Sequence, residues 1–155
     1  MFSETYEIFA DYHQFYLQDE TADGDLSEAW TDATVANMLA VVEGAVGVGT
    51  VRNMRVTVNV EVFSREPSLE SSEWDLVNEC SISVQSGRLV IAGCTDYFPS
   101  AKRIEVPSGT YRVRVCYGNL NSVSADGLEG SDHYRLQLWP GSAIRPTIVK
   151  ALTPN

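Results

Sequence analysis

Apolar and polar residues alternate along much of this chain, and the alternation predicts β-strands. In the segment 54–63, valines at every second position alternate with polar or charged residues. Successive side chains of a strand point to opposite faces, so this segment would bury one face and leave the other in water. The segments 110–117 and 133–139 show the same alternation. Such patterning is typical of antiparallel sheets that cover a core with one face.

Two hairpins are expected where turn-forming residues separate apolar runs. The first has its turn at Ser86-Gly87 and the second at Pro107-Ser108-Gly109. Their arms would be the strands 76–85 with 88–94, and 103–106 with 110–117.

The remaining strands are less regular. The aromatic-rich segment 5–17 is expected to form one strand with a bend near Ala10-Asp11. Shorter strands are expected at 46–49 and at 145–151, the latter at a sheet edge.

One short helix is predicted near residues 32–43. Thr31 is a suitable N-cap, Asp32 places negative charge in the first turn, and Gly44 would end the helix. Apolar residues follow at helical spacing, and they are Val35, Met38, Leu39 and Val42.

Together these patterns predict an all-β fold, mainly antiparallel. We expect a two-sheet β-sandwich of about seven to nine strands with the single short helix. The chain has 155 residues, 44% of them hydrophobic and 21% charged, which is ordinary for a globular protein with a proper core. A single domain spanning residues 1–155 is therefore expected.

Charge is distributed unevenly along the chain. The first 51 residues contain no lysine or arginine, whereas the remainder has equal numbers of acids and bases, so the net charge of −10 lies in the first third. The ten acids there are Glu4, Glu7, Asp11, Asp19, Glu20, Asp23, Asp25, Glu28, Asp32 and Glu43. This balance argues against nucleic acid and anionic membranes as direct ligands. It favours a basic partner, a cation, or simple solubility.

The three cysteines are expected to be free thiols. Cys80, Cys94 and Cys116 are odd in number and have no CxxC spacing. A three-residue hairpin loop would set Cys80 opposite Cys94, whereas a two-residue turn would separate them. The sequence therefore leaves the question of a disulfide between these two undecided.

The start of the chain lacks a basic, apolar leader, and no apolar segment is long enough to span a membrane. A cytoplasmic location is therefore expected.

The polar loop from Asp19 to Glu28 raises the question of calcium. An EF-hand loop beginning at Asp19 would need a bidentate glutamate at its twelfth position, where Trp30 stands. A calcium- or carbohydrate-binding sandwich module that uses this loop remains the alternative function. No metal ligand set and no cofactor is predicted.

No enzymatic signature is present in the sequence. His13 and His133 are the only histidines, and no nucleophile elbow, zinc-protease, phosphate-loop or dinucleotide motif occurs. We expect a binding protein without catalytic residues.

Four short motifs carry a resemblance to a known family. They are Tyr12-His13-Gln14-Phe15, Trp30-Thr31-Asp32 at the start of the helix, Arg52-Asn53 before a long strand, and the Pro-x-Gly-x-Tyr turn from Pro107 to Tyr111. In this order they resemble the competence protein family typified by the bacterial DNA-entry nuclease inhibitor. The likeness covers residues 12–63 and 100–138, and the segments 64–74, 94–98 and 119–132 depart from it.

The resemblance implies a small inhibitor or immunity-type protein that binds and silences a nuclease. A nuclease has a cationic cleft for phosphates, so carboxylates of the inhibitor would mimic the substrate and aromatic side chains would anchor it. The expected mimic charges are Asp19, Glu20, Asp23, Asp25 and Glu28. The expected anchors are Tyr12, His13, Tyr16 and Trp30, for each of which core packing is the alternative.

Overall fold

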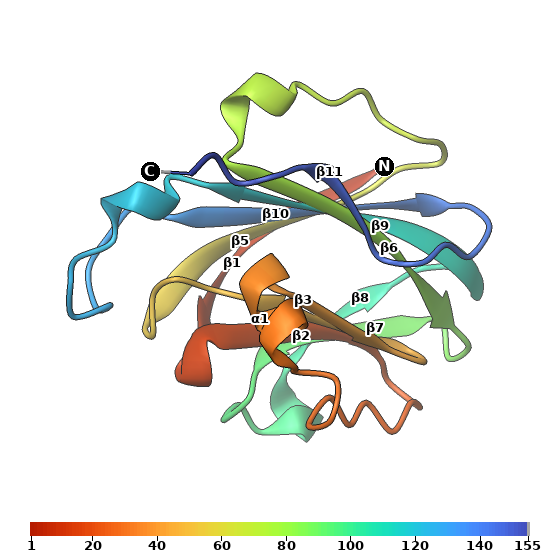
Figure 1. The fold of residues 1–155 in the computed structure, drawn as a ribbon. Helices are drawn as coiled ribbons and strands as arrows, with labels where there is room; N and C mark the ends of the chain where they lie inside the picture. Colours follow the sequence, from red (N-terminus) through yellow and green to blue (C-terminus); the bar gives the residue numbers. More distant parts are fainter. Residues whose placement is uncertain (155) are drawn as a thin grey trace.

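The computed structural model describes residues 1–154 as two β-sheets stacked face to face (Figure 1). The six-stranded sheet contains, in spatial order, β1 (Phe2–Phe9), β5 (Arg55–Val62), β10 (His133–Pro140), β9 (Gly109–Gly118), β6 (Leu76–Val84) and β11 (Thr147–Lys150). The five-stranded sheet contains β3 (Leu39–Val42), β4 (Ala45–Gly49), β2 (Gln14–Asp19), β7 (Arg88–Gly93) and β8 (Lys102–Glu105). The predicted all-β sandwich is confirmed, with eleven strands instead of seven to nine.

The helical elements are all short. The helix α1 spans Asp32–Asn37, and the 3-10 helices are η1 (Asp11–His13), η2 (Ser71–Glu73), η3 (Phe98–Ser100) and η4 (Leu120–Ser122). No helix in the described part of the chain is long and apolar enough to cross a membrane.

The strand pairs are antiparallel with one exception. β10 lies between β5 and β9, antiparallel to β9 but parallel to β5, with Tyr134 beside Val58. The predicted mainly antiparallel arrangement therefore holds. The parallel pair joins the middle third of the chain to its last third.

The core lies between the two sheets and follows the predicted alternation. Val56, Val58 and Val60 are fully buried on the inner face of β5. At the centre, the ring of Tyr134 makes edge-to-face contacts with Phe15 on one side and Tyr117 on the other, each at 5.9 Å between centroids. Edge-to-face aromatic pairs of this kind stabilise a core beyond their buried area.

The expectation of one bent strand at residues 5–17 is wrong. The chain leaves the six-stranded sheet at Phe9, turns through η1 and enters the five-stranded sheet at Gln14. Tyr12 and His13 both have φ near +59°, a left-handed conformation outside the β region, so regular strand pairing stops here. The bend is thus a crossing between sheets.

Both expected hairpins are also wrong, for the same reason. β6 and β7 lie in different sheets, as do β8 and β9, so the turns at residues 85–87 and 106–108 are crossings as well. Turn chemistry at Ser86-Gly87 does not say which sheet receives the next strand. Here β7 pairs with β2 and β8 instead of returning along β6.

The predicted helix 32–43 is correct only in its first half. α1 ends at Asn37, Met38 caps it with φ +58°, and residues 39–42 form β3. Val42 pairs with Ala45, so Glu43-Gly44 is a two-residue hairpin turn and Gly44 has φ +76°. Pairing of the β-branched residues with β4 overrides the helical spacing.

The outer face of the six-stranded sheet is not simply solvated. Arg114 on this face is only 3% exposed, because the connection 64–74 lies over it. Its guanidinium pairs with Glu79 at 3.0 Å and lies 4.9 Å from the centre of the Trp139 ring. This connection therefore forms part of the packing of the sheet, as Figure 1 shows above β9 and β6.

All three cysteines are free, as predicted. Cys80 and Cys116 are buried in the six-stranded sheet, and Cys94 is exposed after β7 in the other sheet. Burial raises the pKa of the Cys80 thiol to about 12. Cys80 and Cys94 thus form no disulfide with each other.

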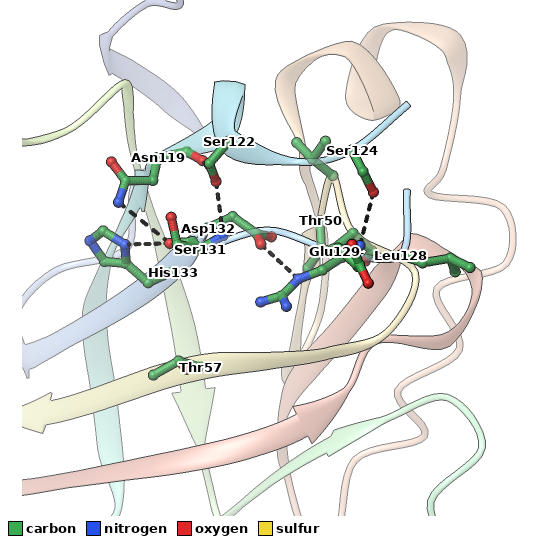
Figure 2. Close-up of polar contacts among 12 residues, drawn as sticks. Thr50, Thr57, Asn119, Ser122, Ser124, Leu128, Glu129, Ser131, Asp132 and His133 are labelled. Atoms are coloured by element: carbon green, nitrogen blue, oxygen red, sulfur yellow. Dashed lines mark hydrogen bonds and ion pairs between the residues drawn. The ribbon is translucent and has the colours of Figure 1, made fainter. Parts of the chain in front are cut away.

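A buried ion pair ties the polar loop 119–132 to the start of β5. Arg52 Nε lies 2.8 Å from Asp132 Oδ1, and the hydroxyl group of Tyr134 donates to Asp132 Oδ2 at 2.6 Å. Within the loop, Ser122 Oγ accepts from the Ser131 amide at 2.9 Å, next to Asp132 (Figure 2). Burial, followed by the bond to Asp132, raises the pKa of Tyr134.

Replacement of Asp132 by alanine should destabilise the fold by about 3–5 kcal/mol, because it leaves the Arg52 guanidinium buried without its counter-charge. The free energy of unfolding from urea titration measures the effect. Glu129→Ala in the same loop is the control, since the Glu129 side chain is exposed, and it should change stability by less than about 0.5 kcal/mol. Equal losses in the two variants would contradict the importance of the buried pair.

Candidate functional site

Residues 20–31, which we call the covering loop, fold back over the outer face of the five-stranded sheet (Figure 1). Trp30 lies directly against β4, where a Cβ at Gly47 would come within 2.8 Å of its ring. The indole Nε1 of Trp30 donates to Gln14 Oε1 at 2.8 Å. Further along, Gln18 Nε2 donates to the Ala22 carbonyl at 2.9 Å. The loop is thus held to the sheet at both ends.

Asp19, the last residue of β2, anchors the start of this loop from inside the protein. It is 2% exposed, and its Oδ1 accepts from the Ser86 amide at 3.1 Å and from the Ser86 hydroxyl group. Its Oδ2 accepts from Thr21 Oγ1 at 2.8 Å. Burial alone would raise the pKa of this carboxyl, but the bonds from Ser86 and Thr21 together outweigh it, so the pKa is lowered.

The Glu20 carboxylate is engaged within the chain. It lies 2.6 Å from Arg88 Nε and 3.0 Å from Arg103 Nε. Its hydrogen bonds, first from Arg88 and then from Arg103, lower the pKa of the carboxyl group. Asp19 and Glu20 therefore join β2 to β7 and β8, and neither presents a free charge at the surface.

A pocket of about 300 Å³ opens at the Gly44 end of β4, and we call it the acidic pocket. The exposed carboxylates of Asp23, Asp25 and Glu43 stand on its lining. Asp25 accepts from the Ser27 amide at 2.9 Å, and hydrogen bonding by Ser27 lowers its pKa. No lysine or arginine lines this pocket, so its potential is negative.

A second depression, of about 400 Å³, opens at the Gly49 end of β4, and we call it the aromatic hollow. Apolar surface dominates its lining, which includes Tyr12, His13, Trp30, Val35 and Met38. Tyr12 is 69% exposed and Val35 is 59% exposed. Large apolar side chains therefore surround a concave space that is open to water.

The backbone of the aromatic hollow is held in a left-handed conformation at three places. Tyr12, His13 and Met38 have φ between +58° and +59°, and they are three of the four non-glycine residues with positive φ in residues 1–154. Each such residue costs about 1–2 kcal/mol relative to an ordinary conformation. Such strain tends to gather at functional sites, where the surrounding structure can hold it.

The two depressions lie at opposite ends of β4 and share the covering loop. The covering loop contributes residues 21–25 to the acidic pocket and Ser27 and Trp30 to the aromatic hollow. Five residues of an extended strand span about 16 Å, so the depressions have the spacing of neighbouring contacts in one protein interface.

The predicted site residues fall into three groups. Tyr12, His13 and Trp30 meet in the aromatic hollow, and Asp23 and Asp25 meet in the acidic pocket. Asp19 also lines the acidic pocket but is buried. The remaining three lie apart: Glu20 is paired, Tyr16 is half-buried between Gly47 and Ala92 on the sheet, and Glu28 lines a groove between α1 and β11.

Three residues of this face were missed by the sequence reasoning, namely Val35, Met38 and Glu43. Val35 and Met38 were assigned to the apolar stripe of the predicted helix. Glu43 was placed inside the helix, although Glu43-Gly44 between two β-branched runs is also a signal for a two-residue hairpin turn. Among residues 1–154, no three histidine, cysteine or acidic side chains are arranged to hold a metal ion.

The stability of the protein should fall as the pH drops below about 4, in part because of Asp19. Its folded-state pKa is lower than its ordinary value of 3.8, so its contribution is present above the unfolded pKa and is lost as the pH falls through the folded pKa. Urea titrations between pH 3 and 6 give the free energy of unfolding at each pH. This free energy should depend less on pH for Asp19→Asn than for the unaltered protein. Asp23→Asn is the control, and a profile flattened equally by both changes would contradict the role of Asp19.

Tyr12→Asn should stabilise the fold by about 0.5–1 kcal/mol, because asparagine tolerates the left-handed conformation and the Tyr12 side chain buries little. Tyr97→Asn is a matched control, since Tyr97 is 74% exposed but has φ −72°. Thermal unfolding should separate the two variants by several degrees, and an equal melting temperature would argue against strain at Tyr12.

Comparison with known proteins identifies the fold. No protein-family model matches the chain, and no curated protein sequence matches it. Among solved structures, ComJ of Bacillus subtilis, an inhibitor of the DNA-degrading activity of NucA, is similar with a TM-score of 0.67 and 18% identity over 89% of this chain and 96% of ComJ. The product of crocagin biosynthetic gene J is similar with a TM-score of 0.58 and 19% identity over 92% of this chain and all of its own length. The resemblance to the competence nuclease inhibitors is thus confirmed at the level of the fold.

Proposed function

We propose that this protein is a non-catalytic inhibitor that binds a basic, nuclease-like protein. The observation that carries the proposal is the acidic pocket, in which Asp23, Asp25 and Glu43 present exposed carboxylates, with the aromatic hollow at the other end of β4. The fold adds support, because ComJ, which has a similar fold, inhibits a DNA-degrading enzyme. No specific observation favours the calcium- or carbohydrate-binding alternative.

The chemistry of a nuclease explains why such a face would suit it. A cleft that binds the phosphates of DNA is cationic, and a set of fixed carboxylates can occupy it in place of the substrate. In this role Asp23, Asp25 and Glu43 attract the partner from a distance and raise the rate of association. Asp19 and Glu20 have a different task, since they hold the covering loop in position.

Inhibition itself follows from occupation of the cleft. A protein that covers the phosphate-binding surface excludes DNA by steric overlap and by charge repulsion, so no chemical step by the inhibitor is needed. The affinity then depends on the inhibitor and nuclease surfaces alone, and it should weaken as salt screens the carboxylates.

The experiment combines the purified protein with a panel of basic nucleases that includes NucA of Bacillus subtilis, and measures DNA degradation and complex formation. We expect the protein to suppress DNA degradation by at least one nuclease of the panel at about 20 mM salt, with weaker binding at about 0.5 M. Absence of both complex and inhibition at low salt would overturn the proposal.

A charge-neutralised variant tests the acidic pocket itself. The triple change Asp23→Asn, Asp25→Asn and Glu43→Gln should slow association about tenfold or more at low salt, with a much smaller effect at high salt. The triple change Glu70→Gln, Glu73→Gln and Glu129→Gln removes the same net charge from exposed positions elsewhere and is the matched control. Equal slowing by both would mean that net charge, and not this pocket, governs association.

A further inference from the structure

The aromatic hollow combines exposed apolar side chains with a concave shape. Single exposed apolar residues are normal on a protein surface, but here Tyr12, Val35 and Met38 surround one depression with Trp30 at its side. Water in such a space meets few polar groups, because the Trp30 indole nitrogen is already bonded to Gln14. Displacement of this water by an apolar group is therefore favourable.

Both walls of the hollow are fixed by hydrogen bonds. The α1 wall is held where Met38 O accepts from the Tyr117 hydroxyl group at 2.7 Å and Asn37 O accepts from Asn78 Nδ2 at 2.8 Å. On the opposite wall, Thr50 N donates to His13 O at 2.8 Å, and His13 Nδ1 lies 3.2 Å from Val51 O. A site that is rigid before binding loses little conformational freedom when a partner enters.

The hollow is built entirely from the part of the chain that has acidic but no basic side chains. Asp11 precedes the lining residue Tyr12 in η1. Asp32 and Val35 are three residues apart in α1 and so lie on the same side of the helix. No lysine or arginine occurs before Arg52, and the Arg52 guanidinium pairs with Asp132. Positive charge on the partner would thus meet carboxylates around an apolar centre.

We propose that the aromatic hollow is the anchor site for one protruding apolar side chain of the partner, the size of leucine or methionine, flanked by lysine or arginine. The inference rests on the proposed function and assigns the partner segment that the face recognises, a basic loop with an apolar tip. A charged side chain at the centre would lose its hydration against apolar walls, whereas charged neighbours stay in water at the edge of the hollow. The left-handed residues Tyr12, His13 and Met38 set the shape of this site, so strain in the free protein serves recognition.

Short peptides test the anchor without any nuclease. The probes are the blocked tripeptides Arg-Leu-Arg, Arg-Ser-Arg and Glu-Leu-Glu, titrated against the full chain while the amide of Gly49 and the indole N–H of Trp30 are followed by NMR. We expect Arg-Leu-Arg to bind at least fivefold more tightly than either of the others, with shifts centred on the hollow. Equal binding of Arg-Leu-Arg and Arg-Ser-Arg, or shifts centred elsewhere, would overturn the proposal.

A variant and its control complete the test. Val35→Asn places a polar group on the lining at an exposed position of α1, and Ile148→Asn makes the same kind of change at the exposed strand β11. Val35→Asn should weaken Arg-Leu-Arg binding at least fivefold, and Ile148→Asn should leave it unchanged. Equal effects of the two changes would count against the hollow.

The nuclease assay separates this inference from the proposed function. If the Val35→Asn variant still inhibits the nuclease fully, the proposed anchor site is contradicted, whereas the proposed inhibitor function stands. Binding of Arg-Leu-Arg in the hollow without inhibition of any nuclease of the panel would overturn the inhibitor function, and it would support the hollow as a site for basic segments with an apolar tip.

Discussion

Two tyrosine hydroxyl groups lie in the middle of the sandwich, and the need to give each a hydrogen-bond partner shapes much of the molecule. Tyr117 and Tyr134 are at most 1% exposed. The Tyr117 hydroxyl group donates to Met38 O and accepts from Asn78, while the Tyr134 hydroxyl group donates to Asp132 and accepts from the Val51 amide. A buried phenol without partners would cost free energy, so these bonds fix the backbone of segments far away in sequence.

The segments fixed in this way form the two walls of the aromatic hollow. Met38 caps α1 on one side, and Val51 contacts His13 on the other. Core tyrosines from β9 and β10 thus determine the shape of a surface depression to which they contribute no side chain. The left-handed residues around the hollow can persist because the surrounding hydrogen bonds over-determine their conformation.

The sequence predicted where strands occur better than it predicted which sheet each strand joins. The alternation at 54–63 and 133–139 correctly indicated which side chains face the core, because a period of two is a property of the strand itself. It carries no information on which sheet a strand joins, so the crossings at η1 and at Ser86-Gly87 were interpreted as a bend and a hairpin turn. In the segment 38–42, helical spacing and β-branched residues gave opposing signals, and pairing with β4 decided the outcome.

The sequence was equally limited in predicting the candidate site. The absence of basic residues from the first 51 positions indicated an acidic surface. Whether each carboxylate is exposed or paired within the protein depends on residues distant in sequence. Asp19 meets Ser86 and Glu20 meets Arg88 and Arg103, so these two serve the fold, whereas Glu43 projects from a hairpin turn into the acidic pocket. Local sequence cannot reveal such contacts.

The parallel pairing of β5 with β10 has a consequence for how the chain is made. β10 inserts between β5 and β9, so the first two strands of the six-stranded sheet, β1 and β5, cannot join the rest until residues 133–140 have left the ribosome. Until then β5 presents an unpaired edge, and its closure requires a contact between distant parts of the chain. Such topology is typical of slow folding, and it makes β10 the element whose arrival completes the sheet.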